Sequence, residues 1–376
     1  MSDTYAEAKK FAEEFVAPYS KEIDKKAEFP KESFEKMGER GYFKLLLPEA
    51  VGGLGKTLLD HAEVCRAFAE GNASTALCYM MHNVALMCVM SYGSDQMKET
   101  VVKDVVEKKR FLALAYSEFG TGTHFYKSEI KVRSSDNRVT FNGVKSMVTS
   151  AENASYYLVI APSINVKDGV DNWLFPLGTP GLTFQMELWD GLGMRGNISC
   201  PMKIDDVTLD ESWRIGAEGT GLEQVLTAVA PPFVLGLAAI YAGVCQNLLD
   251  IATRHAKQRV YPDGQALCNI ETVQIHLANI YARAQASKLF ALEAARAAVA
   301  GEADALAKII ASRVFASESV IECGRLAMRV GGGKAYNKHT EIERLLRDAY
   351  AGQIMAPSVD VLLVWLGKAL TDQPIP

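Results

Sequence analysis

The chain has 376 residues, of which 49% are hydrophobic, so it is long and apolar enough to build a large core and more than one domain. Its net charge of −5 is spread over well-mixed acidic and basic residues, which excludes the basic face typical of nucleic-acid binding. No signal peptide stands at the start and no apolar run is long enough to span a membrane, so the sequence predicts a cytoplasmic protein.

The spacing of cysteines and histidines gives no sign of a metal site. The seven cysteines are scattered and include no Cys-x-x-Cys pair. His124, His255 and His276 do not cluster with carboxylates at ligand spacing. We therefore expect buried thiols in a reducing compartment and no bound metal.

The first part of the chain, residues 1–110, is predicted to be helical. Apolar residues recur at helical spacing over 6–17 and 32–41, and the helical pattern resumes from Leu58 to about Arg110. Between these stretches, the glycines of 52–55 predict a loop, because glycine adopts backbone angles that other residues resist.

The middle part, residues 111–215, is predicted to be a β domain. Helical spacing disappears, and short runs of Val, Ile, Phe and Thr alternate with turn residues, as at 138–141, 156–160 and 173–175. Asn142-Gly143 follows the first of these runs, and this dipeptide predicts a hairpin turn.

The last part, residues 216–376, is predicted to be helical again. The pattern returns from Gly221, and the stretches 238–259 and 273–300 carry long Ala- and Leu-rich faces typical of bundle helices. The order of helices, β domain and helices indicates an α+β fold.

Six short segments occur in a fixed order along the chain. They are Leu47-Pro48-Glu49 with Gly52-Gly53, Ser-Glu-Phe-Gly-Thr-Gly-Thr at 117–123, Gly143-x-Lys145 with Met147-Val148-Thr149-Ser150, Gly193-Met194-Arg195-Gly196 with Asp205-Asp206-Val207, Gly331-Gly332-Gly333, and Arg344-x-x-Arg347-Asp348-Ala349. Each segment alone is weak evidence, but their order and spacing are specific. On these residues the chain resembles the acyl-CoA dehydrogenase family over nearly its whole length.

The resemblance implies an N-terminal helical domain, a middle β-barrel or β-sandwich domain and a C-terminal four-helix bundle. It also implies a homotetramer or homodimer that binds FAD between the β domain and the bundles. The implied substrate is a small acyl thioester such as acyl-CoA, and an electron-transfer partner is one way to reoxidise the flavin.

A flavin ring needs an apolar slot and polar groups at its edges. Glycines let the backbone approach the ring, and Ser and Thr hydroxyls can hydrogen-bond to it. Taken alone, a Ser-Thr-Gly cluster is more often a turn, but its place in the family order favours cofactor contact. Met147 stands where the family usually has a tryptophan and still offers a polarisable thioether. The predicted contacts are Tyr116, Ser117, Gly122, Thr123, Met147, Val148 and Thr149.

The diphosphate of FAD needs positive charge and an open backbone. By the resemblance, Arg259 reaches it from a neighbouring subunit, since a guanidinium grips phosphate oxygens in bidentate fashion. The simpler alternative is a surface arginine at a helix C-terminus, where cations are favoured. The other predicted contacts to the adenosine-diphosphate end are Arg329, Gly332, Gly333, Ser358 and Asp360.

The glutamate that starts the chemistry in this family is missing. In the main branch it removes the proton next to the thioester carbonyl, and Ala356 occupies its position. A second branch carries its glutamate on the first long bundle helix, where this chain has Phe233 and Val234. His82 is a candidate substitute because its ordinary pKa suits proton transfer near neutrality, although a buried, hydrogen-bonded histidine is the commoner case. Tyr241 and Tyr350 are weaker candidates, whereas Glu223 is too distant in the sequence and Glu118 matches a family glutamate that is not the base.

The preferred functional hypothesis is an FAD-dependent oxidoreductase that oxidises the α,β bond of an acyl-CoA or similar thioester with a non-standard base. One alternative is a flavin monooxygenase or desulfinase on the same fold, which fold analogy alone supports. A second alternative is a non-catalytic member of the family that acts as a partner subunit.

Overall fold

The computed structural model describes residues 2–375. Its N-terminal part is helical, as predicted, and Thr57 with Asp60 forms a capping box that fixes the start of one long helix. Asn72 fixes the start of the next by accepting a hydrogen bond from the backbone N of Thr75 (2.8 Å). The helices are α1 (Asp3–Phe15), α2 (Ser20–Lys26), α3 (Lys31–Glu39), α4 (Leu58–Gly71), α5 (Ala73–Tyr92) and α6 (Asp95–Val106).

The middle part folds into two four-stranded sheets that pack together. Their strand orders are β1-β4-β5-β8 and β2-β3-β7-β6, and β1 and β4 pair in parallel while the other pairs are antiparallel. Phe141 of one sheet packs against Trp173 and Phe175 of the other at ring-centre distances of 4.9 and 5.0 Å. The strands are β1 (Leu112–Ala115), β2 (Lys131–Ser135), β3 (Arg138–Val148), β4 (Tyr156–Pro162), β5 (Val170–Pro176), β6 (Leu182–Phe184), β7 (Cys200–Asp210) and β8 (Arg214–Ile215).

The hairpin turn predicted at Asn142-Gly143 is wrong. Strand β3 continues through this dipeptide, and a register shift against β7 lies there instead. The turn falls six residues earlier, at Asp136-Asn137, where both residues have positive φ (50° and 61°). The Asn142 side chain is used across the sheet, because its amide donates to Asp206 Oδ1 (2.8 Å) and its oxygen accepts from Asp206 N (2.9 Å).

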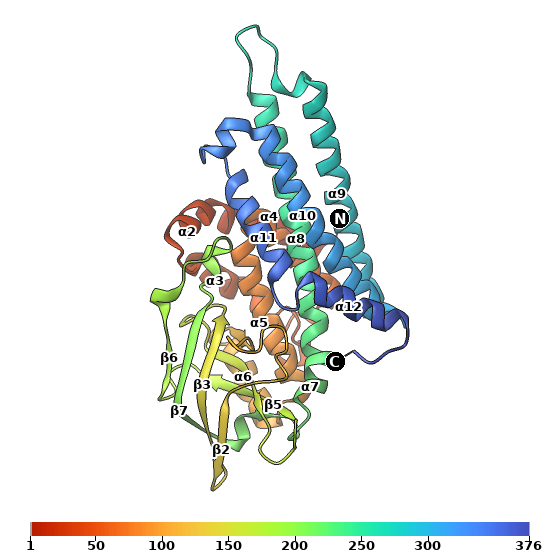
Figure 1. The fold of residues 1–376 in the computed structure, drawn as a ribbon. Helices are drawn as coiled ribbons and strands as arrows, with labels where there is room; N and C mark the ends of the chain where they lie inside the picture. The colour runs from red at the N-terminus through yellow and green to blue at the C-terminus, as the bar shows by residue number, and fades with distance from the viewer. Residues whose placement is uncertain (1, 376) are drawn as a thin grey trace.

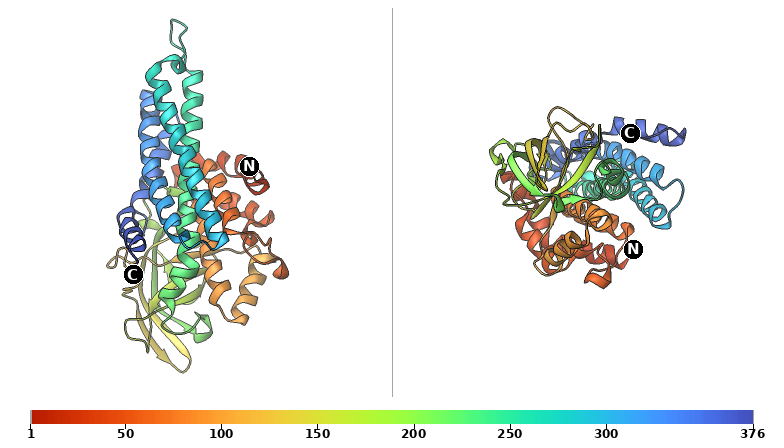
Figure 2. Two further views of the ribbon diagram at one scale, coloured as in Figure 1. Left: turned by 90° about the vertical axis from the view of Figure 1, so that its right-hand side faces the viewer. Right: turned by 90° about the horizontal axis from the view of Figure 1, so that it is seen from below.

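The C-terminal part is a helical bundle, so the predicted α+β architecture is confirmed. Helices α8, α9 and α10 run side by side in a tall column, and α4 also packs on α8 (Figures 1 and 2). The N-terminal helices cover one side of this column, and the β domain lies at its lower end (Figure 2). The elements are α7 (Gly221–Gln224), α8 (Ala230–Gln258), α9 (Glu271–Ala300), α10 (Ala305–Tyr336), α11 (Ile342–Ile354) and α12 (Val359–Leu370).

A π-helical turn, Val225–Val229, joins α7 to α8. It directly precedes Pro231 and Pro232, which have no backbone N–H and cannot donate to carbonyls one α-turn earlier. The wider turn lets the helix continue from Gly221 despite the two prolines. Single π turns of this kind are frequent at functional sites.

The expectation that no segment reaches membrane-spanning length is corrected by two helices. Ala73–Tyr92 and the continuous helix Gly221–Gln258 are long and apolar enough by length and composition, and the pair α11 and α12 passes the same test only if taken together across a 44° bend. In the fold, 89% and 78% of the two apolar windows are buried. These helices therefore use their apolar surfaces to build the core.

The contact between α4 and α8 depends on a residue without a side chain. A Cβ on Gly243 would lie 2.4 Å from Arg66 O and 2.9 Å from Ala69 Cβ. Gly243→Ala should lower the free energy of unfolding by about 1–3 kcal/mol through overpacking. As a control, Gly367→Ala in α12 meets no atom within 4 Å and should raise it by up to about 1 kcal/mol through helix propensity. Urea unfolding measures both changes, and equal effects would contradict the close approach of α4 and α8.

Candidate active site

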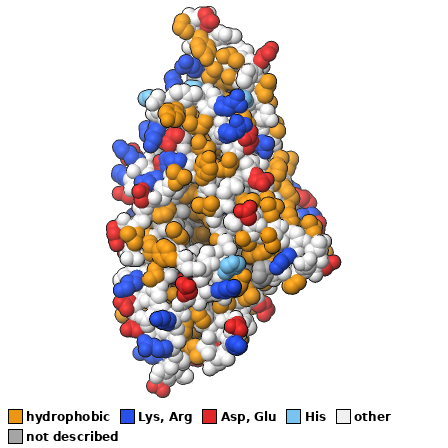
Figure 3. Space-filling view, viewed as in Figure 1, with side chains coloured by type: hydrophobic (Ala, Val, Ile, Leu, Met, Phe, Trp, Pro, Cys, Tyr) orange, Lys and Arg blue, Asp and Glu red, His pale blue; other side chains and the backbone are white. Residues whose placement is uncertain are grey.

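A cavity of about 560 Å³ lies where the β domain, the start of α8 and the segment joining α11 to α12 meet. Its volume falls within the roughly 300–1,000 Å³ typical of ligand pockets. On the face seen in Figure 1, the surface is hollowed near its middle and hydrophobic side chains border the hollow (Figure 3).

The polar side of the cavity comes from two strand ends of the β domain. Tyr116 and Ser117 follow β1, and Ser146 near the end of β3 donates its backbone N–H to Ser117 O (2.8 Å), which holds the two segments together. On this side Thr149 Oγ1 lies 3.0 Å from Ser199 Oγ. The predicted residues that line the cavity are Tyr116, Ser117, Gly122, Thr123, Met147 and Thr149. The side chain of Val148 does not line it, because it is fully buried in the sheet opposite Cys200.

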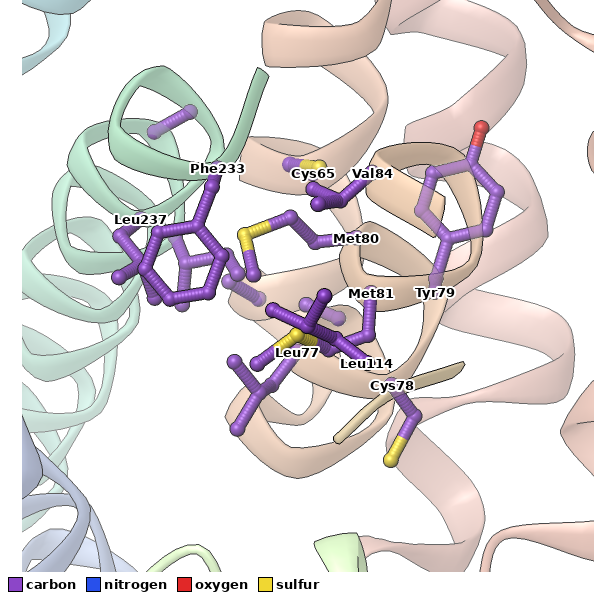
Figure 4. Close-up of a cluster of buried hydrophobic side chains, with 14 of the residues drawn as sticks. Cys65, Leu77, Cys78, Tyr79, Met80, Met81, Val84, Leu114, Phe233 and Leu237 are labelled. Carbon is purple, nitrogen blue, oxygen red and sulfur yellow. The ribbon is translucent and has the colours of Figure 1, made fainter. Parts of the chain in front are cut away.

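The floor of the cavity is apolar. Met81 of α5, Leu114 of β1 and Phe233 of α8 line it together with side chains of the π-helical turn. Figure 4 shows these three residues in one buried cluster with Met80 and Leu237. Such a floor excludes water from whatever lies above it. Sequence reasoning missed the contribution of the π-helical turn, although the double proline that follows it is a visible signal.

One face of α11 forms the opposite wall. Arg347, Tyr350, Ala351 and Ile354 line the cavity, and their spacing of three, four and seven residues places them on the same side of a helix. The segment 355–357 continues this wall, so Ala356 lies on it as well.

The helix α11 is held by contacts to the β domain and to the N-terminal helices. A Cβ on Gly193 would lie 2.3 Å from Arg347 O, so the backbones touch there. Met194 N donates to Asp348 Oδ1 (2.6 Å). Arg347 donates to both oxygens of Asp24 (2.9 and 2.6 Å) in α2 and to Leu192 O (2.9 Å), and the hydrogen bonds to Asp24 raise the pKa of Arg347. The close approach explains why a glycine stands at 193.

Glu118 is the one carboxylate among the described residues that line the cavity. Its Oε1 accepts from Lys145 Nζ (2.5 Å) and from Ser128 Oγ (2.6 Å), and its Oε2 accepts from Glu129 N (2.6 Å). Because both oxygens are engaged, Glu118 is not free to act as a base.

The structure does not support His82 as the base. Its side chain is fully buried and does not line the cavity. Nε2 lies 2.7 Å from Phe43 O and Nδ1 accepts from Leu112 N (3.1 Å), so backbone groups use both ring nitrogens. Burial lowers the pKa of His82 to about 4, which keeps the ring neutral. Of the two weaker candidates, Tyr350 lines the cavity and Tyr241 does not; Glu223, which the sequence already disfavoured, does not line it either.

The residues predicted to bind the adenosine-diphosphate end do not line the cavity of their own chain. Arg259 lies at the C-terminal end of α8, at the end of the bundle far from the β domain (Figure 1). Arg329, Gly332 and Gly333 lie in the last turns of α10, and Gly332 has a non-helical backbone there (φ 53°). Ser358 and Asp360 stand at the start of α12, directly after the cavity wall.

Nothing in the described part of the chain, residues 2–375, gathers three or more His, Cys, Asp or Glu side chains in a metal-binding group. The cysteines are unpaired thiols, and all of them except Cys268 are buried.

The buried state of His82 predicts a pH dependence of stability. Its pKa lies below the value of 6.5 expected in the unfolded chain, so unfolding takes up a proton as the pH falls from 6.5 towards 4. The free energy of unfolding should therefore fall by about 3 kcal/mol over this range on account of His82. His82→Gln keeps a donor and an acceptor but does not titrate. Between pH 7 and pH 4, the free energy of unfolding of this variant should therefore fall by about 3 kcal/mol less than that of the wild type. Urea unfolding at both pH values measures this, and identical losses would show that His82 is not buried as described.

Comparison with known proteins places the chain in a family. Its residues 3–109, 113–207 and 219–370 match the models "Acyl-CoA dehydrogenase, N-terminal domain", "middle domain" and "C-terminal domain". It is 28% identical to cyclohex-1-ene-1-carbonyl-CoA dehydrogenase of Geobacter metallireducens over 94% of this chain and 93% of that one. It is also 28% identical to 3-(aryl)acrylate reductase of Clostridium sporogenes, over 91% and 90%.

Solved structures share the fold. Butyryl-CoA dehydrogenase from Megasphaera elsdenii superposes with a TM-score of 0.92 at 24% identity, covering 99% of both chains. The FAD complex of PigA superposes with a TM-score of 0.89 at 22% identity, covering 98% of this chain and 97% of that one. These matches do not favour the monooxygenase, desulfinase or non-catalytic alternatives. The chain therefore belongs to the acyl-CoA dehydrogenase family.

Proposed function

We propose that this protein binds FAD in the cavity and oxidises the α,β carbon–carbon bond of an acyl thioester such as acyl-CoA. The observation that carries the proposal is the division of the cavity into two sides. Hydroxyls and strand-end backbone line one side, and apolar side chains line the floor. A planar aromatic cofactor that lies beside an acyl chain needs both a polar side and an apolar floor.

The residues present fit a flavin. Thr121 Oγ1 is buried without a hydrogen-bond partner among the described residues, and it stands next to the cavity-lining Gly122. Gly122 has a positive φ (54°), and no atom lies within 4 Å of where its Cβ would be, so its backbone is open to a ligand. Met147 is 56% exposed and supplies a thioether beside these groups.

The proposal includes a second copy of the chain. Arg259 and the end of α10 lie at the far end of the bundle from the cavity, so they can reach only the cofactor of another subunit (Figure 1). Burial lowers the pKa of His255, and the nearby positive charges of Lys334 and Arg259 lower it further, so two cations lie near this end of the bundle. A cluster of cations suits the diphosphate of FAD.

The side chains that line the cavity determine what the protein contributes to the reaction. When bound, FAD supplies the acceptor for the hydride that leaves the β carbon. The hydroxyls of Ser117 and Thr149 are placed to donate to polar atoms of a ligand, and the apolar floor keeps water from the acyl chain. Ala356 cannot accept the α proton, and Glu118 is held by Lys145. Tyr350 is the cavity-lining titratable side chain that makes no hydrogen bond among the described residues, so its hydroxyl is available to a substrate.

The visible spectrum of the purified protein, with and without added FAD, tests cofactor binding. Anaerobic addition of saturated acyl-CoAs of different chain length and branching then tests the reaction. We expect a bound-flavin spectrum that bleaches with at least one acyl-CoA. A colourless protein that cannot be reconstituted with FAD would refute the proposal. A bound flavin that no acyl-CoA bleaches, but that consumes oxygen when reduced by NADH, would favour the monooxygenase alternative.

Restoring a carboxylate to the wall should increase dehydrogenation. A positioned general base contributes about 10²- to 10⁴-fold, so Ala356→Glu should raise the rate of flavin reduction by a saturated acyl-CoA by up to that factor. Ala356→Gln is the matched control, because it has nearly the same size and cannot accept the proton. Stopped-flow absorbance measures the rates. An equal gain in both variants, or no gain in either, would show that position 356 does not face the reacting carbon.

A further inference from the structure

A buried ion pair lies at the polar side of the cavity, with Glu118 lining the cavity and Lys145 behind it. Glu118 belongs to the segment after β1, and Lys145 belongs to β3. The Lys145 side chain is 0% exposed and the Glu118 side chain 3%. Their neighbours in sequence, Ser117 and Ser146, both line the cavity. Any movement of the pair is therefore transmitted to the cavity wall.

Lys145 uses all three of its donors within the fold. Its Nζ donates to Glu118 Oε1 (2.5 Å), to Ile160 O (2.6 Å) and to Tyr116 O (3.4 Å). Ile160 lies in β4, and Tyr116 directly follows β1. The ammonium group thus joins three strands at the edge where Tyr116 enters the cavity wall.

Glu118 closes the loop that follows it. Its Oε1 also accepts from Ser128 Oγ, and its Oε2 accepts from Glu129 N, both at 2.6 Å. The residues in between, 119–127, form a rim loop that carries the cavity-lining Gly122 and Thr123. One carboxylate therefore ties together the two ends of the rim loop.

The strength of these bonds depends on ionisation. Hydrogen bonds to a carboxylate are shorter and stronger than those to a neutral acid. Lys145 supplies the one positive charge that lies within hydrogen-bond distance of the buried Glu118 carboxylate. Burial also lowers the pKa of Lys145 to about 8, against the attraction of Glu118. Lys145 therefore loses its proton as the pH rises above about 8, and the ion pair weakens.

We propose that Lys145 and Glu118 are positioning residues for the cofactor site. Lys145 fixes the position of the Glu118 carboxylate, and that carboxylate holds the rim loop and the strand ends in the shape that FAD requires. This inference rests on the proposed function, because it concerns the same cavity. It goes further by assigning the shape of the polar wall to two buried charges.

The test compares Lys145→Met, Glu118→Gln and the double variant with the wild type. Each single variant should weaken FAD binding about tenfold or more, because charge-assisted bonds to the rim loop are lost. Amide hydrogen exchange at Glu129 should become faster in the same variants. The double variant has no unpaired buried charge, so its thermal midpoint should recover while FAD binding stays weak. Lys203→Met, which breaks an exposed ion pair with Asp205 in β7, is the control and should change none of these readouts.

Two results would overturn the proposal. One is wild-type FAD affinity and unchanged exchange at Glu129 in the single variants. The other is recovery of FAD affinity together with stability in the double variant, since the pair would then only compensate charge. If Lys145→Met does not fold, Glu118→Gln carries the same test. If the wild type binds no FAD, the proposed function fails, while exchange at Glu129 still reports whether the pair holds the rim loop.

A pH series gives an independent readout. FAD affinity of the wild type should fall between pH 7 and pH 9, as Lys145 loses its proton. The double variant lacks Lys145 and should show a flatter profile over that range. Parallel profiles for the two proteins would contradict the role of the ion pair.

Discussion

The junction at Arg347 and Asp348 is the constraint on which the site depends. Arg347 bridges from α11 to Asp24 in the N-terminal helices and to the backbone of Leu192 in the β domain, and Asp348 accepts from Met194 N. Gly193 leaves no space between its own backbone and that of Arg347. Since all three parts of the chain meet at this point, the cavity-facing side of α11 is fixed against the β domain.

This junction gives the cavity two unlike sides. The ends of β1 and β3 bring hydroxyls and backbone to one side, and α5, the π-helical turn and α8 supply an apolar floor. A dry floor strengthens electrostatic interactions at the polar side, because nearby water no longer screens them. The buried charges of Glu118 and Lys145 lie at that side and are hydrogen-bonded within the fold, so they shape the wall and leave the chemistry to other groups. Ala356 lies on the cavity wall at the position of the family's glutamate, so the wall offers no carboxylate to a substrate there.

Much of the fold followed from local patterns, because helical periodicity and β-branched runs depend on neighbouring residues. The polar side of the site was also visible in the sequence, because the segments 117–123 and 143–150 resemble those of the acyl-CoA dehydrogenase family. The predicted turn at Asn142-Gly143 was wrong because the Asn142 side chain pairs with Asp206, which is distant in the sequence. The partners of His82, Phe43 O and Leu112 N, are likewise far along the chain, so its engagement could not be seen.

The central claim is that the cavity between the strand ends and α11 is the flavin site. A crystal structure of the protein reconstituted with FAD and soaked with an acyl-CoA tests it most directly. The account predicts an isoalloxazine ring against the segments 116–123 and 147–149, with the acyl chain over Met81 and Phe233. A cavity closed by the protein's own side chains, with the flavin bound elsewhere, would contradict it.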